Sequence, residues 1–178
     1  ARIMDRKPVA ILEFGSGVST LVSAILMRHL YGTDAPRVFT IEQGEQSGMD
    51  TRMRLDALGL SALVQMHIAP IRSARVDAFQ SDGYGISSAE LGRFLRGVSP
   101  DMVLIDGPHG GHGVRFSTLP VAHSWLASGA EIWIADALRD SEMSIAHGWA
   151  ELGYWVNPTL QVVSKGIAIG QRGASPKN

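Results

Sequence analysis

The stretch DGPHGGHGVRF, residues 106 to 116, gathers an acid, two histidines and an arginine among four glycines. This composition has little value for packing, so the stretch is a candidate reactive loop. Histidine titrates near neutral pH and can take a proton from a hydroxyl, which makes His109 and His112 candidate bases. The carboxylates of Asp106 and Asp136 each follow an apolar run and could join the same site. An alternative without catalysis stays open, in which Asp106 accepts hydrogen bonds from its own turn and both histidines are solvated.

A second loop with chemical potential is EFGSGVST, residues 13 to 20. Its glycines let a ligand approach the backbone without a Cβ in the way. Ser19 or Thr20 can cap the following helix, whose free amide hydrogens attract a carboxylate or a phosphate. Three ligands meet this description: a nucleoside triphosphate, a dinucleotide and S-adenosylmethionine.

The residue types in this loop separate the three ligands. A triphosphate loop ends in Gly-Lys-Ser or Gly-Lys-Thr, and the stretch contains no lysine. The dinucleotide fingerprint has a third glycine where Thr20 stands, so that match is incomplete. Glu13 would repel a pyrophosphate but attract an ammonium group, and the methionine half of S-adenosylmethionine carries one. Among the three ligands, the loop therefore favours S-adenosylmethionine, while the alternative that these are ordinary turn residues stays open for this motif alone.

These residues need a scaffold that brings several strand ends together. Short apolar runs alternate with helix-length segments, which predicts a parallel sheet with crossover helices. The expected strands are Val9–Glu13, Arg37–Glu42, Leu63–Ile68, Asp101–Ile105 and Glu131–Ala135. The expected helices are Ser19–Leu30, Met49–Leu58, Ser88–Arg96, Val114–Leu126 and Asp140–Leu152.

The last part of the chain breaks this alternation. Residues 154–173 hold two β-rich runs separated only by residues 164–166, so the two strands must be antiparallel. We therefore predict an α/β, Rossmann-like doubly wound sheet, mostly parallel with a C-terminal antiparallel hairpin, in three α/β/α layers. Residues 1–178 are expected to form one domain. The one longer insertion, residues 73–87, is either a mobile lid or a plain surface loop.

The composition limits the function classes. Sixteen basic and 17 acidic residues give a formal charge of −1, so no footprint for nucleic acid stands out. The absence of cysteine excludes disulfides, thiolate nucleophiles and iron–sulfur clusters, and it suits a cytoplasmic protein. No apolar run approaches the ~20 residues of a membrane helix. The chain starts at Ala1 rather than at a methionine, which leaves open a trimmed amino terminus.

With its motifs in this order, nearly the whole sequence resembles class I S-adenosylmethionine-dependent methyltransferases. The EFGSG stretch is similar to the first motif of that family. Glu42 closes the second expected strand, where the family has an acid that binds the ribose hydroxyls. Asp106 and Asp136 are similar to the acids that follow its fourth and fifth strands. The loop after the fourth strand resembles a subgroup with an Asp-Gly-Pro sequence.

The resemblance implies S-adenosyl-L-methionine as the cofactor. Ile68 and Ala69 lie in MHIAPI, a segment that contacts adenine in the family, although the frequent acid or amide is missing there. The residues expected to bind the cofactor are Glu13, Gly15, Ser16, Gly17, Ser19, Thr20, Glu42, Ile68, Ala69 and Asp106. The residues expected to take part in catalysis are Asp106, His109, His112 and Asp136.

The implied reaction is methyl transfer to a small-molecule acceptor, with oxygen as the expected acceptor atom. The protein then mainly aligns two reactants and excludes water. His109 or His112 could serve as the base. Alternatively, Asp106 and Asp136 could bind Mg²⁺, as in catechol-type relatives. Those relatives usually supply a further acid or amide after the fifth strand, whereas alanines flank Asp136 here. We therefore expect no metal.

Two other function classes stay open. A nicotinamide-dependent oxidoreductase would need the first loop to accept a pyrophosphate beside Glu13. A non-catalytic S-adenosylmethionine-binding module would keep the same pocket without turnover. Nucleic-acid methylating relatives tend to carry a Pro-Pro-aromatic motif that the Asp106 loop lacks, so neither nucleic acid nor a membrane is an expected partner. The short segment before Val9 leaves open a homodimer whose second subunit covers the pocket.

Overall fold

The computed structural model describes residues 2–32, 35–76 and 79–174, and a seven-stranded sheet forms its centre. The strand order is β3-β2-β1-β6-β7-β9-β8. Five neighbouring strands are parallel, and β9 runs antiparallel to both β7 and β8. The predicted mostly parallel sheet with a C-terminal antiparallel hairpin is thus confirmed. The strands of this sheet are β1 (Ile11–Phe14), β2 (Val38–Glu42), β3 (Val64–Ile68), β6 (Met102–Ile105), β7 (Glu131–Ala135), β8 (Trp155–Gln161) and β9 (Ile167–Arg172).

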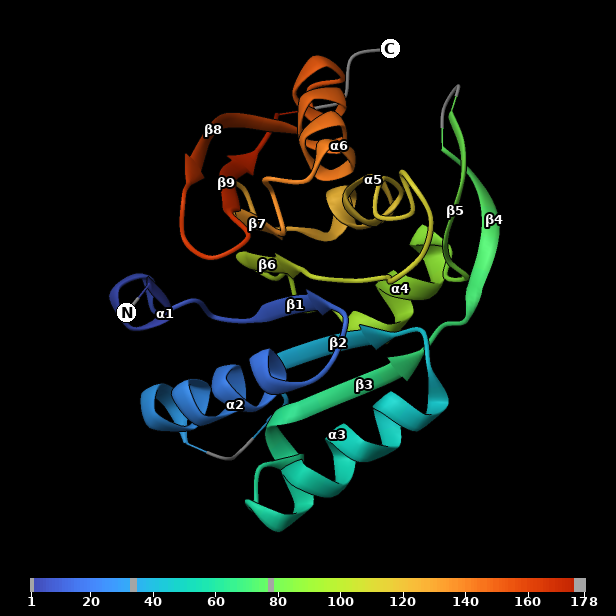
Figure 1. The fold of residues 1–178 in the computed structure, drawn as a ribbon. Coiled ribbons are helices and arrows are strands. Elements are labelled where there is room, and N and C mark those ends of the chain that lie inside the picture. Colours follow the sequence, from blue (N-terminus) through green and yellow to red (C-terminus); the bar gives the residue numbers. More distant parts are fainter. Residues whose placement is uncertain (1, 33–34, 77–78, 175–178) are drawn as a thin grey trace.

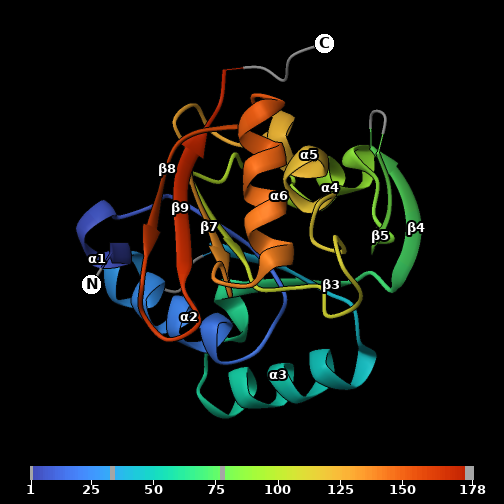
Figure 2. The same ribbon diagram turned by 45° about the horizontal axis from the view of Figure 1, so that its top comes forward.

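Helices cover both faces of the sheet, which gives the predicted three layers. Figures 1 and 2 show α2 and α3 on one face and α4, α5 and α6 on the other. The short α1 lies beside α2. The helices are α1 (Arg2–Arg6), α2 (Val18–Tyr31), α3 (Glu45–Ala57), α4 (Ser88–Leu95), α5 (Thr118–Ala122) and α6 (Asp140–Glu151), with 3-10 turns at η1 (Ser61–Leu63) and η2 (His123–Trp125). No helix in the described part of the chain is long and apolar enough to cross a membrane.

The central strands are buried on both faces, which explains their nearly continuous apolar sequences. Every residue of β1 and β2 is buried. Glu13 and Glu42 are the acidic members of these two strands, and both lie near the carboxyl end. All the expected strands and three of the five expected helices agree with the structure to within two residues at either end.

Two predicted helices need correction. The helix expected at Met49–Leu58 begins earlier, at Glu45. The helix expected at Val114–Leu126 is reduced to α5 and η2, and residues 114–117 form a turn. The cause is Arg115, which is only 1% exposed and donates to carbonyl oxygens of the two strand ends instead of entering a helix.

The insertion at residues 73–87 contains a structure that the sequence pattern missed. β4 (Ile71–Val76) and β5 (Phe79–Tyr84) form a separate antiparallel pair. Figure 1 shows this hairpin standing beyond the carboxyl ends of β2 and β3, near α4. The hairpin therefore brings the end of β5 to the edge of the sheet where the candidate site residues gather.

Candidate functional site

Glu13, in β1, is a buried carboxylate with one free oxygen. Its side chain is 1% exposed, and Oε2 accepts hydrogen bonds from the hydroxyls of Thr20 at 2.6 Å and Thr40 at 2.9 Å. Oε1 finds no partner in the described part of the chain. Burial raises the pKa of Glu13 to about 7, although the hydroxyls of Ser19, Thr20 and Thr40 oppose this rise and the charge of Asp106 adds to it. A cation at Oε1 would stabilise the ionised carboxylate.

The loop after β1 turns sharply, as its glycines allow. Gly15 and Gly17 have positive φ angles of 99° and 143°. A Cβ on Gly15 would approach the backbone nitrogen of Gly107 to 3.0 Å, so the first loop and the loop after β6 touch. The Gly17 amide donates to Thr20 Oγ1 at 3.0 Å. This arrangement leaves the amino-terminal turn of α2 directed toward the strand ends.

Glu42, in β2, has a different environment, because both of its oxygens have partners. Oε2 accepts from the Ser16 amide at 2.8 Å and from the Ser16 hydroxyl at 2.7 Å. Oε1 accepts from the Gly44 amide at 2.9 Å. Glu42 therefore ties the first glycine loop to the start of α3.

A small polar cleft of about 70 Å³ lies between the ends of β1, β2 and β6. It brings together five of the predicted cofactor residues. The residues that line it are Gly15, Ser16, Ser19, Glu42, Gln43, Ser47, Tyr84, Asp106, Gly107 and His109. Glu13 and Thr20 lie directly behind this wall, since Thr20 caps the loop and bonds Glu13.

The loop after β6 closes this polar cleft. The His109 amide donates to Gln43 Oε1 at 2.6 Å, and Gln43 Nε2 donates to the His109 carbonyl at 3.2 Å. These two bonds clasp residues 106–113 to the end of β2. A cleft of this volume is smaller than ordinary small-molecule sites, which are about 300–1,000 Å³. The clasp therefore forms part of the wall of a narrow cleft.

Ile68 and Ala69 are close to Glu42 but are not among the residues that line the polar cleft. The Ala69 amide donates to the Glu42 carbonyl at 2.7 Å, so this segment supports the end of β2. Ile68 packs against Gly48 in α3. Their role as adenine contacts stays a prediction.

Arg115 joins the ends of β6 and β7 from inside the protein. Its guanidinium donates to the carbonyls of Asp106 at 2.7 Å and Ala135 at 3.0 Å. It also lies 3.4 Å from the Asp106 carboxylate and 3.5 Å from the Asp136 carboxylate. Arg115 thus pairs with two acids although its side chain is buried.

The other predicted catalytic residues differ in how free they are. The Asp136 carboxylate is 12% exposed and pairs with Arg139 at 2.9 Å. The Asp106 side chain is 57% exposed at the cleft. His109 lines both the polar cleft and a second polar pocket beside it. His112 lines the second pocket but not the polar cleft. Among the described residues, no group of three or more acidic or histidine side chains is placed to hold a metal ion.

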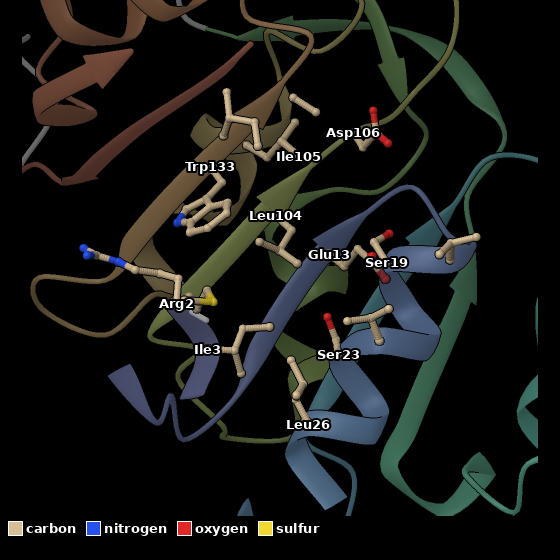
Figure 3. Close-up of a pocket in the computed structure, with 15 residues that line it drawn as sticks. Arg2, Ile3, Glu13, Ser19, Ser23, Leu26, Leu104, Ile105, Asp106 and Trp133 are labelled. Carbon is tan, nitrogen blue, oxygen red and sulfur yellow. The ribbon is translucent and has the colours of Figure 1, made fainter. Parts of the chain in front are cut away.

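An apolar trough of about 480 Å³ adjoins the polar cleft on the α2 face of the sheet. Figure 3 shows Leu104 and Trp133 of the sheet beside Leu26 of α2. Glu13, Ser19 and Asp106 line its inner end, and Ser19 and Asp106 also line the cleft. The two cavities are therefore neighbours with shared walls.

Four residues of the polar cleft were not among the expected site residues: Gln43, Ser47, Tyr84 and Gly107. Gln43 directly follows Glu42 and Gly107 directly follows Asp106, so proximity in sequence was an available signal for these two. Tyr84 comes from the β4–β5 hairpin, and its only sequence signal was a tyrosine between two glycines.

The described residues fit S-adenosylmethionine on two observations. Glu13 Oε1 is a buried acceptor without a partner in the described chain, as an ammonium site requires. The positive-φ glycines bring backbone, rather than side chains, to the same point. Glu42 supplies a second carboxylate at the end of the next strand.

Solved structures share this fold over nearly the whole chain. The O-methyltransferase TomG from Streptomyces achromogenes, solved with SAM, is 17% identical with a TM-score of 0.63, over 97% of this chain and 77% of TomG. The SAH-bound Podospora anserina methyltransferase PaMTH1 is 15% identical with a TM-score of 0.64, over 99% of this chain and 75% of its own. An O-methyltransferase from Bacillus cereus, solved with SAH, is 14% identical with a TM-score of 0.62, over 96% of this chain and 77% of its own.

No protein-family model matches the sequence, and no curated protein matches it. At these identities the structural likeness concerns the fold. The chain therefore has the fold of these methyltransferases, as the first loop and the strand order predicted.

Proposed function

We propose that the protein is an S-adenosylmethionine-dependent methyltransferase that methylates an oxygen of a small molecule. The observation that carries the proposal is the free Oε1 of Glu13 beside the glycine loop. A buried carboxylate oxygen without a partner costs free energy unless a ligand satisfies it. The fold shared with SAM- and SAH-bound methyltransferases supports the same conclusion.

Three groups of this chain would hold the cofactor. Glu13 would accept a hydrogen bond from the ammonium group. Ser19 and the first amides of α2 would face the carboxylate. Glu42 would exchange its bonds to Ser16 or Gly44 for the ribose hydroxyls. Once bound, the cofactor supplies a methyl group on a positively charged sulfur.

The acceptor would occupy the apolar trough. Its volume of about 480 Å³ falls within the range for small ligands, and its walls are mostly apolar with Trp133 as the aromatic member. The Trp133 ring is fixed, because Nε1 donates to Glu131 at 2.7 Å. Asp106 lines both cavities, so it would orient an acceptor hydroxyl toward the cleft.

His109 is the base in this proposal. It lines the cleft beside Asp106 and is exposed enough to exchange protons with water. His112 lies one pocket farther away and would relay the proton outward. Asp136 is engaged by Arg115 and Arg139, so it would position the loop rather than receive a proton.

Calorimetric titration with S-adenosylhomocysteine tests the cofactor, and NADH serves as the competing ligand. We expect binding of the first and none of the second. Binding of NADH alone would contradict the proposal and favour an oxidoreductase.

A panel of phenols and other hydroxylated small molecules, incubated with labelled S-adenosylmethionine, tests turnover. For any accepted molecule, His109→Asn should lower kcat strongly and leave S-adenosylhomocysteine binding intact. His147→Asn, an exposed change on α6, is the control. Cofactor binding without turnover across the panel would instead support a non-catalytic module.

The remaining parts of the proposal concern partners and location. The nearly balanced charge of −1 and the absence of cysteine support a cytoplasmic protein without a nucleic-acid partner. Exposed Val18, Val22 and Ile25 on α2 support a homodimer. Sedimentation at micromolar concentration would test the dimer.

A further inference from the structure

Tyr84 is a buried tyrosine whose hydroxyl has no hydrogen-bond partner within the described residues. The side chain is 4% exposed and lines the polar cleft with Glu42, Asp106 and Gly107. Its ring packs on Phe14, the last residue of β1, with the ring centroids 5.6 Å apart. The aromatic ring is therefore fixed, and its hydroxyl lies beside Gly107 in the wall of the cleft.

Three glycines allow the close packing around this tyrosine. A Cβ on Gly83 would collide with the Ser117 hydroxyl, and a Cβ on Gly85 would come 2.7 Å from the Pro70 carbonyl. A Cβ on Gly107 would collide with the Tyr84 hydroxyl itself. The two flanking glycines let the hairpin pack closely, and Gly107 leaves room above the hydroxyl.

The chemistry of the hydroxyl restricts what can satisfy it. Burial, followed by the negative charge of Glu42, raises the pKa of Tyr84 far above its usual value, so the phenol keeps its proton. It is thus a hydrogen-bond donor and not a base. A buried hydroxyl left without a partner destabilises the folded protein. A ligand atom that accepts this bond would relieve that destabilisation.

We propose that Tyr84 donates a hydrogen bond to the nucleoside half of the bound cofactor. This inference rests on the proposed function. The nucleoside half is favoured because Glu42 and Gln43 at the end of β2, and Ser47 in the first turn of α3, line the same cleft as Tyr84. Glu13, the residue suited to the ammonium group, lines the apolar trough and not the polar cleft. The β4–β5 hairpin then serves to deliver one cofactor-binding residue.

The experiment compares the full chain with Tyr84→Phe, which keeps the ring and removes only the hydroxyl. Calorimetry measures the affinity for S-adenosylhomocysteine and for 5′-methylthioadenosine, which lacks the amino-acid half. We expect both affinities to fall about three- to tenfold, the value of one hydrogen bond. The melting temperature of the free protein should stay equal or rise, because the lost hydroxyl had no partner. A purely structural tyrosine would show the reverse pattern.

Tyr31→Phe is the matched control. Tyr31 lies at the end of α2 and donates to the Lys7 carbonyl at 2.7 Å, so its loss should lower the melting temperature slightly and leave affinity unchanged. Unchanged affinity in Tyr84→Phe, or a loss for S-adenosylhomocysteine alone, would overturn the inference. A lower melting temperature in that variant would overturn it as well. If the unaltered protein binds neither compound, the proposed function fails together with it.

Discussion

The ends of β1 and β2 carry two buried glutamates whose carboxylate oxygens differ in their hydrogen-bond partners. Glu13 has one oxygen held by threonine hydroxyls and one that is free within the described structure. Glu42 has both oxygens bonded to the backbone and side chain of neighbouring loops. Both are almost inaccessible to solvent, at 1% and 6% exposure. Burial alone therefore does not show whether the two oxygens of an acid have hydrogen-bond partners.

The difference lies in what each acid contributes before a ligand arrives. Glu42 has hydrogen-bond partners in the free protein, and in the proposed function it would exchange them on binding. Glu13 destabilises the free protein, because its buried charge is only half satisfied. A ligand cation would supply the missing partner of the Glu13 carboxylate. At Glu42, a ligand would replace hydrogen bonds that already exist. Substitutions at the two positions should thus affect affinity and stability in different proportions.

The largest expected effect is on affinity at Glu13. Glu13→Gln keeps the size and the bonds to Thr20 and Thr40 but removes the charge. We expect the affinity for S-adenosylhomocysteine to fall about 10- to 100-fold, since hydrogen bonds to charged groups contribute about 1.5–3 kcal/mol. The melting temperature should not fall. Calorimetry and thermal denaturation together measure both quantities.

Glu151→Gln is the matched control, because Glu151 is an exposed acid at the end of α6. It should change neither quantity. An unaltered affinity in Glu13→Gln would show that the free oxygen serves no ligand, and the contrast with Glu42 would lose its meaning.

The same residue predicts a pH dependence of stability. Its folded pKa of about 7 lies above the ordinary value of 4.5. A group with a raised folded pKa holds its proton longer in the folded state, so its stabilisation is complete below pH 4.5 and is lost as pH rises to about 7. Between these limits the wild type should lose roughly 3 kcal/mol relative to Glu13→Gln. Urea unfolding of both proteins at pH 5 and pH 8 measures this; parallel curves would contradict it.

A smaller change in affinity, with a clear loss of stability, is expected for Glu42→Gln. The amide offers one acceptor oxygen where three donors now bind, so at least one amide or hydroxyl is left unpaired. We expect about tenfold weaker binding and a free energy of unfolding about 1–3 kcal/mol lower. Denaturant titration measures the second quantity. An unchanged free energy of unfolding in Glu42→Gln would contradict the inference that Glu42, unlike Glu13, stabilises the free protein.

The smallest effect concerns the clasp between Gln43 and His109. Gln43→Ala removes both bonds that hold the loop over the polar cleft. We expect association with S-adenosylhomocysteine to become about two- to fivefold faster, because opening precedes entry. Stopped-flow tryptophan fluorescence measures the rate. Gln46→Ala, which removes only an exposed bond to Asp50, should leave the rate unchanged.

Local sequence patterns predicted the fold and the positions of the two glutamates, but not their hydrogen-bond partners. Alternating apolar runs and helix-length segments were sufficient to predict a mostly parallel sheet and to place Glu13 and Glu42 at strand ends. That only one of them keeps a free oxygen could not be predicted. It depends on Ser16 reaching across to β2 and on Thr40 reaching back to β1, contacts between residues 26 and 27 positions apart.

Other misses have the same cause. The segment that contains Tyr84 was expected to be a lid or a surface loop. The structure instead packs its hairpin closely at Gly83 against Ser117, and no local sequence pattern indicates this contact. The helix expected from Val114 fails because Arg115 is drawn to the ends of two strands. In each instance a long-range contact overrides a local preference.

Arg115 has one more consequence. Its positive charge belongs to the chain itself and lies between the carboxylates that end β6 and β7. The loop after β6 is therefore held by a positive charge that is already present in the free protein. Neither a chelator nor a shortage of metal should change the shape of this loop.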